Sequence, residues 1–178
     1  MTSRFTGMLC STLALLVAGG CGGGSSSAEA VAWTDEVCGA LAGFTRAATT
    51  RPDVDRTDPV ATVRGYSDYF GSAAAGIDTA ITRLESAGAS PLDGGDEYVT
   101  RLKDALAQIR ASFNTARTQL AEVDTSSVES VTTAIPSATA PLRELSNLAD
   151  PTAGLRANDE LQAAAEEAPN CQALRSTG

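Results

Sequence analysis

Apolar residues recur at every third or fourth position through most of the chain after residue 28, the spacing that places them on one face of an α-helix. The first such run predicts a helix over 29–49, with Trp33, Val37 and Leu41 on its apolar face. We expect this helix to end before Pro52, because the residue that precedes a proline is biased away from helical backbone angles.

The two middle runs predict an antiparallel pair of long helices. One should cover 59–87, because Asp58 is suited to an N-cap, Pro59 to the first helical turn and Gly88 to a left-handed C-terminal position. The other carries a sustained apolar pattern over 99–123. Each helix is roughly 40 Å long at ~1.5 Å per residue. The short turn between them, which contains Pro and Gly, favours packing within one chain over a parallel coiled-coil dimer. The apolar positions are Val63, Tyr66, Phe70, Ala73, Ile77, Ile81 and Leu84 in one helix, and Val99, Leu102, Leu106, Ile109, Phe113, Ala116, Leu120 and Val123 in the other.

A fourth run at helical spacing, over 128–149, contains two prolines. Ser126 and Glu129 have the spacing of a capping box and predict where this helix starts. Pro136 and Pro141 each remove a backbone donor and crowd the carbonyl group four residues earlier. We therefore expect a kinked helix or two abutting pieces. A kink can line a pocket, but we interpret this one as wrapping the helix around the core.

A weaker apolar run predicts a short last helix after the start signal at residues 150–151. Pro169 should stop this helix and deliver Cys171 and Leu174 to the body of the bundle. Residues 175–178 should then form a loose C-terminus.

Together these runs predict an all-α fold. We expect an up-and-down bundle of four main helices, with a kinked fourth helix and a short fifth helix that returns the C-terminus to the first. Aromatic residues make up 4% of the chain and alanine is abundant, so the core should be built from closely packed helices. About 150 residues follow the N-terminal segment, enough for one domain, which we place at 29–174.

The first 20 residues have the order of an export signal. A single cation, Arg4, is followed by an apolar run over 8–18 and then by small residues. The run is too short to span a bilayer as a helix. The small residues end at a cysteine, and the arrangement from Leu15 to Cys21 resembles the lipobox of bacterial lipoproteins. The alternative is a plain secretory signal followed by a chance cysteine.

The lipobox resemblance implies that residues 1–20 are removed and that Cys21, the new N-terminus, is thioether-linked to diacylglycerol. Two acyl chains make a stable anchor, whereas one chain alone holds only marginally. The protein would then be anchored to the cell membrane on its extracytoplasmic face. Residues 21–28 form a tether whose Gly/Ser composition is typical of a flexible coil, so the folded body should float just above the lipid headgroups.

The net charge of the chain argues against some classes of binding partner. Loss of Arg4 with the signal leaves 12 of the 13 basic residues beside all 22 acidic ones, a net charge near −10. This charge argues against a nucleic-acid partner, whose phosphates must be neutralised by Lys and Arg. It also argues against flat docking on an anionic leaflet, so the lipid on Cys21 should be the contact with the membrane. We interpret the acidic residues as serving solubility.

Four cysteines are present, and the lipobox accounts for two of them. Cys10 would leave with the signal and Cys21 would carry the lipid, so Cys38 and Cys171 remain in an oxidising compartment. We expect these two to pair. A bond that closes a loop of more than about 100 residues contributes roughly 4–5 kcal/mol in the chain-entropy model. The alternative is two free, buried thiols.

Both remaining cysteines lie in short motifs. Trp33-x-x-x-Val37-Cys38-x-Ala40-Leu41 and Ala168-Pro169-Asn170-Cys171-Gln172-x-Leu174 together resemble a pattern in uncharacterised actinobacterial secreted proteins and lipoproteins. Arginine far outnumbers lysine, which suits a GC-rich source. The resemblance covers only the two ends of the domain and implies a helical bundle closed by the cysteine pair. That family has no established activity that could be transferred to this chain.

Few residues are suited to catalysis or metal binding. Histidine, the commonest general base and metal ligand, is absent from the whole sequence. Adjacent carboxylates at 35–36, 96–97, 159–160 and 166–167 point apart on a helix, so we interpret them as solvated faces. Residues 53–58 begin like an EF-hand loop, but its sixth position is not Gly and its twelfth is not Glu. We therefore predict neither a metal site nor a cofactor.

These observations favour a non-catalytic binding or interaction module, lipid-anchored at the cell envelope, with a protein partner there that the sequence does not identify. We do not expect an enzyme. The alternative is a carrier or sensor of a small, lipid-like apolar ligand held between the helices. Ala73 and Ala116 would border its cavity. A core closed around Phe70, Ile109 and Phe113 is the prediction that we favour.

Overall fold

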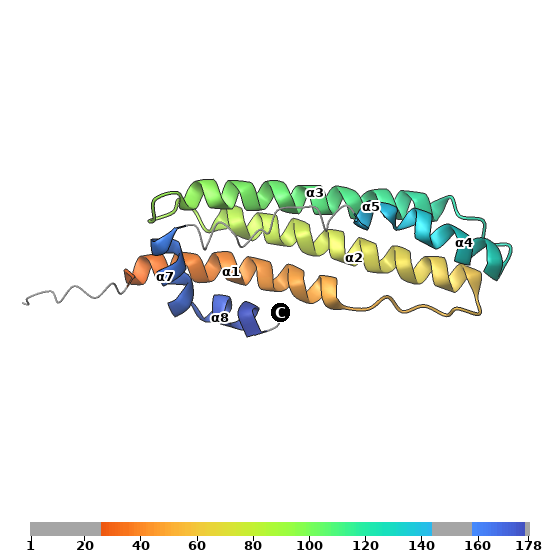
Figure 1. Ribbon diagram of the computed structural model, residues 1–178, viewed down its shortest axis with the longest axis horizontal. Helices are drawn as coiled ribbons and strands as arrows, with labels where there is room; N and C mark the ends of the chain where they lie inside the picture. The colour runs from red at the N-terminus through yellow and green to blue at the C-terminus, as the bar shows by residue number, and fades with distance from the viewer. Residues whose placement is uncertain (1–25, 144–157, 177–178) are drawn as a thin grey trace, which may run out of the picture.

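The computed structural model describes residues 26–143 and 158–176 of the chain, and in those residues all regular secondary structure is α-helical. Three long helices form the body: α1 (Ala28–Thr49), α2 (Pro59–Ser86) and α3 (Gly95–Ala121). Helix α2 packs against α3 as an antiparallel hairpin, and α1 packs against α2 (Figure 1). The all-α class and the hairpin predicted from the apolar pattern are therefore confirmed.

The ends of α2 follow the local signals in the sequence. The Asp58 side chain accepts a hydrogen bond from the amide of Ala61, and Pro59 opens the helix. Gly88, just past the end of the helix, has a φ of 73°, a value that L side chains rarely adopt. These three assignments are confirmed.

The fourth predicted helix is broken between its two prolines, with Pro136 inside the first piece. Helix α4 (Val128–Ala138) ends at Thr139, and a single turn, α5 (Ala140–Arg143), follows it. The expectation of two abutting pieces holds as far as residue 143, whereas residues 144–149 lie outside the described part of the chain. The predicted cap was wrong by one residue. Ser127 accepts the hydrogen bond that starts α4, from the amide of Ser130, whereas Ser126 bonds to Asp124.

The C-terminal segment forms two short helices, where the sequence predicted one. Helix α7 (Asp159–Glu167) begins at the N-cap Asn158, and α8 (Pro169–Ser176) follows it after Ala168. Pro169 ends α7 as expected, but it also opens α8, because proline fits the first turn of a helix. Arg175, predicted to lie in a loose terminus, is helical and donates a hydrogen bond to the carbonyl of Ala165. The predicted start at residues 150–151 lies outside the described residues.

The core runs along the hairpin. Its centre holds the rings of Phe70 and Phe113, stacked with centroids 5.8 Å apart. Ala73 and Ala116 beside them are 0% exposed. Trp33 of α1 is buried as well, and its indole N–H donates to the carbonyl of Gly88, which ties α1 to the turn after α2.

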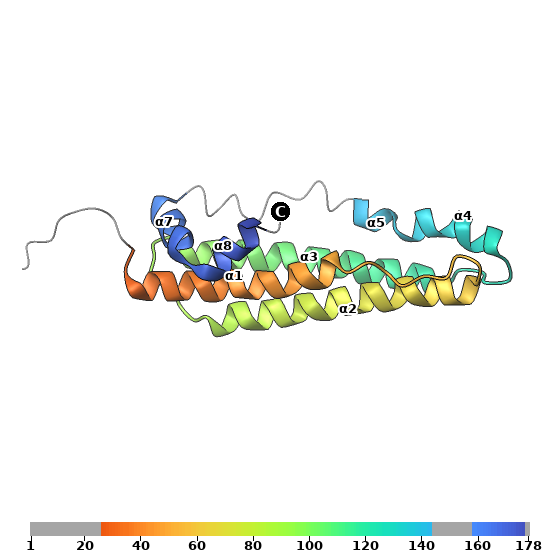
Figure 2. The same ribbon diagram turned by 90° about the horizontal axis from the view of Figure 1, so that it is seen from below.

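Helix α1 is shorter than α2, and this difference divides the molecule into two ends. Near the α2–α3 turn, which we call the anchor end, α1 packs on the hairpin, and α7 and α8 pack on α1 (Figures 1 and 2). Beyond the last turn of α1 the chain continues as the strap, residues 50–58, alongside the first part of α2 (Figure 2). The strap and α4 flank the opposite end of the hairpin, which we call the far end.

Candidate functional site

Two of the three predicted site residues are brought together. The Sγ atoms of Cys38 and Cys171 are 1.98 Å apart in a disulfide that joins α1 to α8 across 133 residues of sequence. Both cysteines are buried. The predicted pairing is therefore confirmed, and the alternative of two free thiols is wrong. The third predicted residue, Cys21, lies outside the described residues.

The disulfide is part of a larger contact between α1 and α8. The carboxylate of Asp35 accepts hydrogen bonds from the amide of Asn170 at 2.7 Å and from its side-chain Nδ2 at 2.9 Å. Asp35 thereby caps the first turn of α8, although it belongs to another helix. Its sequence neighbour Glu36 is exposed. The interpretation of this pair as a solvated face is therefore wrong for Asp35, which serves the fold, and holds for Glu36.

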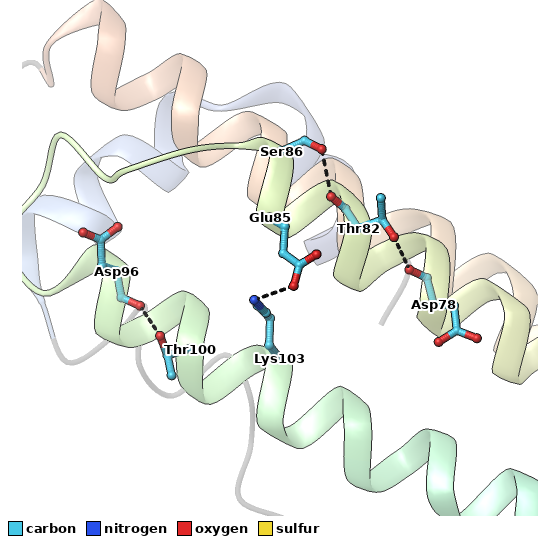
Figure 3. A network of polar contacts seen from close by, with 7 residues as sticks. All are labelled: Asp78, Thr82, Glu85, Ser86, Asp96, Thr100 and Lys103. Carbon is cyan, nitrogen blue, oxygen red and sulfur yellow. Dashed lines mark hydrogen bonds and ion pairs between the residues drawn. The ribbon is translucent and has the colours of Figure 1, made fainter.

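One ion pair joins α2 to α3 near the anchor end, beside hydrogen bonds that lie within each helix. Figure 3 shows Lys103 Nζ of α3 pairing with the Glu85 carboxylate of α2 at 2.8 Å. The hydroxyls of Thr82, Ser86 and Thr100 each donate to a carbonyl one turn earlier in their own helix. Each of these groups already has an intramolecular partner, so we assign this surface a structural role.

A more open arrangement lies at the far end, around the strap. Gly65 lets the strap lie directly on α2, because a Cβ at this position would overlap the carbonyl oxygen of Asp53. One turn earlier, the Thr62 hydroxyl donates a hydrogen bond to the carbonyl of Asp55. The Asp55 carboxylate accepts from the amide and hydroxyl of Thr57 at 2.9 and 2.7 Å. These contacts fix the strap on the helix.

The strap separates two hollows of different character. Asp53 and Asp55 line one of them and Val54 and Arg56 the other, the alternation expected when successive side chains point to opposite sides of extended backbone. We call the first the polar hollow, with a volume of about 490 Å³, and the second the apolar hollow, with about 250 Å³.

The polar hollow lies on one face of α2. Its helical lining residues recur at intervals of three and one, which places them on one stripe of the helix. Arg51, Pro52 and Thr50 of the strap complete the wall. The residues contributed by α2 are Ala61, Arg64, Gly65, Asp68, Tyr69 and Ser72.

Two side chains of the polar hollow have perturbed acidity. The hydrogen bonds from Thr57 hold the pKa of Asp55 below its usual value of 3.8. Burial raises the pKa of the Tyr69 phenol above its usual value of 10.0. Asp55 is thus a carboxylate, and Tyr69 a neutral phenol, at neutral pH.

The apolar hollow lies between α2 and α4. Val54, Pro59, Tyr66 and the α4 residues Val131 and Ile135 form most of its surface. Val128 also lines it and is 44% exposed, and Val60, beside Pro59 in the sequence, is 48% exposed. The remaining lining residues are Arg56, Thr62, Thr132 and Pro136.

Sequence reasoning missed both hollows, although it considered the aspartates of the strap. The alternating oxygens of residues 53–58 resemble the start of an EF-hand loop, but Asp58, which stands where that loop needs Gly, caps α2, and Asp55 bonds to Thr57. Among the described residues, no group of three or more His, Cys, Asp or Glu side chains is placed to hold a metal ion. The sequence Asp53-Val54-Asp55, in which a polar, an apolar and a polar residue follow one another, was the signal that could have indicated two different sides.

Searches against protein-family models, curated proteins and solved structures found no match to this chain. The resemblances to lipoproteins and to actinobacterial secreted proteins therefore stay predictions. Among the described helices, none combines the length and the apolar character needed to cross a bilayer.

Proposed function

We propose that this protein is a lipid-anchored, non-catalytic binding module on the extracytoplasmic face of the cell membrane, with its partner in the cell envelope. The observation that carries the proposal is the buried Cys38–Cys171 disulfide, because such bonds persist in oxidising compartments. Export to such a compartment agrees with the signal-like residues 1–20. Cys21 then provides the lipid attachment site.

The arrangement of the described elements supports a presenting role. Ser26, five residues after Cys21, donates its amide to Glu167 of α7, so the chain enters the fold at the anchor end. The strap begins only after α1, which is about 33 Å long at ~1.5 Å per residue. A lipid on Cys21 would therefore hold the hollows at the far end away from the headgroups, facing the envelope. We extend the proposal to the up-and-down order of four main helices, the fourth of which was predicted over 128–149 and is described as far as residue 143.

Metabolic labelling with a lipid precursor tests the anchor. The parent protein should incorporate the label and fractionate with membranes, whereas Cys21→Ser should do neither. Cys10→Ser is the matched control, because Cys10 lies in the segment that is removed, so this variant should label like the parent. A Cys21→Ser variant that still labels and still sediments with membranes would place the anchor elsewhere.

A second candidate function is a carrier or sensor of a small apolar ligand, and the apolar hollow favours it. Its apolar lining has the character of a ligand site, although its volume of about 250 Å³ is near the lower end of the usual ~300–1,000 Å³. The apolar hollow does not lie where the sequence predicted a ligand cavity, because neither Ala73 nor Ala116 lines either hollow.

A further inference from the structure

We propose that the polar hollow binds a small zwitterionic ligand that carries both a carboxylate and an ammonium group, namely a free amino acid or a short peptide with free termini. The inference deepens the proposed function, on which its biological setting rests. It concerns the chemistry of one site, and it can be tested whether or not Cys21 carries a lipid.

Four charged side chains of this hollow have no hydrogen-bond or ion-pair partner among the described residues. They are the guanidinium groups of Arg51 and Arg64 and the carboxylates of Asp53 and Asp68. Elsewhere on α2 and α3, Arg101, Lys103 and Arg110 form ion pairs, whereas the exposed Arg83 and Arg117 form none with the described residues, so what distinguishes the polar hollow is that four unpaired charges of both signs lie together. The polar hollow therefore gathers charges that the fold itself does not use.

The lack of a bond between Arg64 and Asp68 is informative. The two residues are four apart on α2, and at the same spacing Glu97 and Arg101 of α3 pair at 2.6 Å. The two pairs differ in the order of acid and base along the helix. An acid that precedes a base by four residues is better placed for pairing than a base that precedes an acid. With the base first, both groups of α2 stay available to a ligand.

The four unpaired charges are two of each sign. Asp55 also lines the hollow, but its carboxylate already accepts two hydrogen bonds from Thr57. Two cations and two carboxylates then remain. A simple anion would be repelled by Asp53 and Asp68, and a simple cation by the two arginines. A ligand with one group of each sign satisfies both sets, with its carboxylate on a guanidinium fork and its ammonium on a carboxylate.

The backbone of the site is also held in place before any ligand binds. The strap that carries Arg51 and Asp53 is fixed on α2 by the contacts at Gly65 and Thr62. The volume of about 490 Å³ lies in the range of small-ligand sites. The half-buried Tyr69 supplies an aromatic surface for the apolar part of a ligand. A site that is already ordered avoids part of the entropic cost of binding.

The experiment is a titration of the isotopically labelled full mature chain, followed by backbone-amide NMR. The probes are free alanine, a pool of tripeptides with free termini, and the same pool N-acetylated and C-amidated. We expect the free pool or alanine to shift the amide signals around Arg64 and Asp68, and the capped pool to leave them unchanged. A response to alanine identifies an amino-acid site, and a response to the tripeptides alone identifies a peptide site.

Two variants test the roles of the charges. Arg64→Gln and Asp68→Asn should each weaken binding by about ten-fold or more, because a hydrogen bond to a charged group is lost. Both residues are exposed, so the variants should melt like the parent. Arg83→Gln, an exposed arginine of α2 outside the hollow, is the matched control and should bind normally.

Three results would overturn the inference. The first is equal binding of the free and capped pools, and the second is normal binding by both variants. The third is the absence of any shift with alanine or the free pool at millimolar concentration. The titration is repeated with Cys21→Ser, which lacks the proposed lipid attachment site. If only the lipid anchor is wrong, the labelling fails but both proteins still bind the probes. If only the binding site is wrong, the labelling succeeds but neither protein binds the probes.

Discussion

At the scale of single residues, the strap shows how one missing side chain shapes a surface. Gly65 has an ordinary helical backbone, so its value lies in its lack of a Cβ. The Asp53 carbonyl occupies the space where that Cβ would be. Since both hollows depend on the position of the strap, they depend on this glycine.

We predict that Gly65→Ala destabilises the protein by about 1–3 kcal/mol, because the new methyl group must displace backbone of the strap. Urea unfolding measures this loss. Gly43→Ala is the control, because Gly43 is an exposed helical glycine of α1 with nothing near its virtual Cβ. There the substitution should be neutral or stabilising by up to ~1 kcal/mol. Equal unfolding curves for the two variants would contradict the close contact between the strap and α2.

At the scale of elements, the sequence predicts a helix well where its signals are local. The cap and first turn of α2 are adjacent residues, Asp58 and Pro59, and they were assigned correctly. The start of α8 was missed, because its capping carboxylate, Asp35, is 135 residues away from Asn170. Proline alone does not distinguish the end of one helix from the start of the next.

The α1–α8 contact leads to a prediction about the disulfide. Thiol counting on the denatured, unreduced mature protein should find no free thiol from Cys38 or Cys171. Cys38→Ala should lower the free energy of unfolding by about 2–5 kcal/mol, because a long loop is no longer closed in the unfolded chain.

The matched controls are Cys171→Ala and the double variant. Since each change removes the same disulfide, each should lower the free energy of unfolding by a similar amount. The double variant should lower it little more than either single variant does. Two free thiols in the parent, or a Cys38→Ala variant that unfolds like the parent, would show that the bond does not form in the mature protein.

At the scale of the whole molecule, the apolar pattern predicted the all-α class and the long hairpin. It did not predict how the rest of the chain is divided between the two ends. Helices α4 and α5, separated at Thr139 between Pro136 and Pro141, pack on the hairpin, whereas α7 and α8 pack on α1. The sequence did not predict the candidate site for a related reason. Its walls come from a loop and a helix face, and only the folded chain brings them together.

The last prediction separates a closed core from a ligand cavity along the hairpin. Ala116 of α3 is 0% exposed and lies on the same stripe as Phe113, whose ring stacks on Phe70 of α2. In a closed core, Ala116→Phe overpacks this region and should destabilise the protein by about 1–3 kcal/mol in urea unfolding. Ala111→Phe, on the exposed side of the same helix, is the control and should change stability by no more than ~0.5 kcal/mol.

The same pair of variants tests the carrier function. If a cavity along the hairpin holds an apolar ligand, Ala116→Phe should keep its stability and lose uptake of a fluorescent lipid, because the ring fills the space that the ligand needs. In a closed core any uptake occurs elsewhere, and Ile135→Ser, in the apolar hollow, should reduce it more than Ala111→Phe does. A stable Ala116→Phe variant that no longer takes up the lipid would contradict the closed core and favour the carrier.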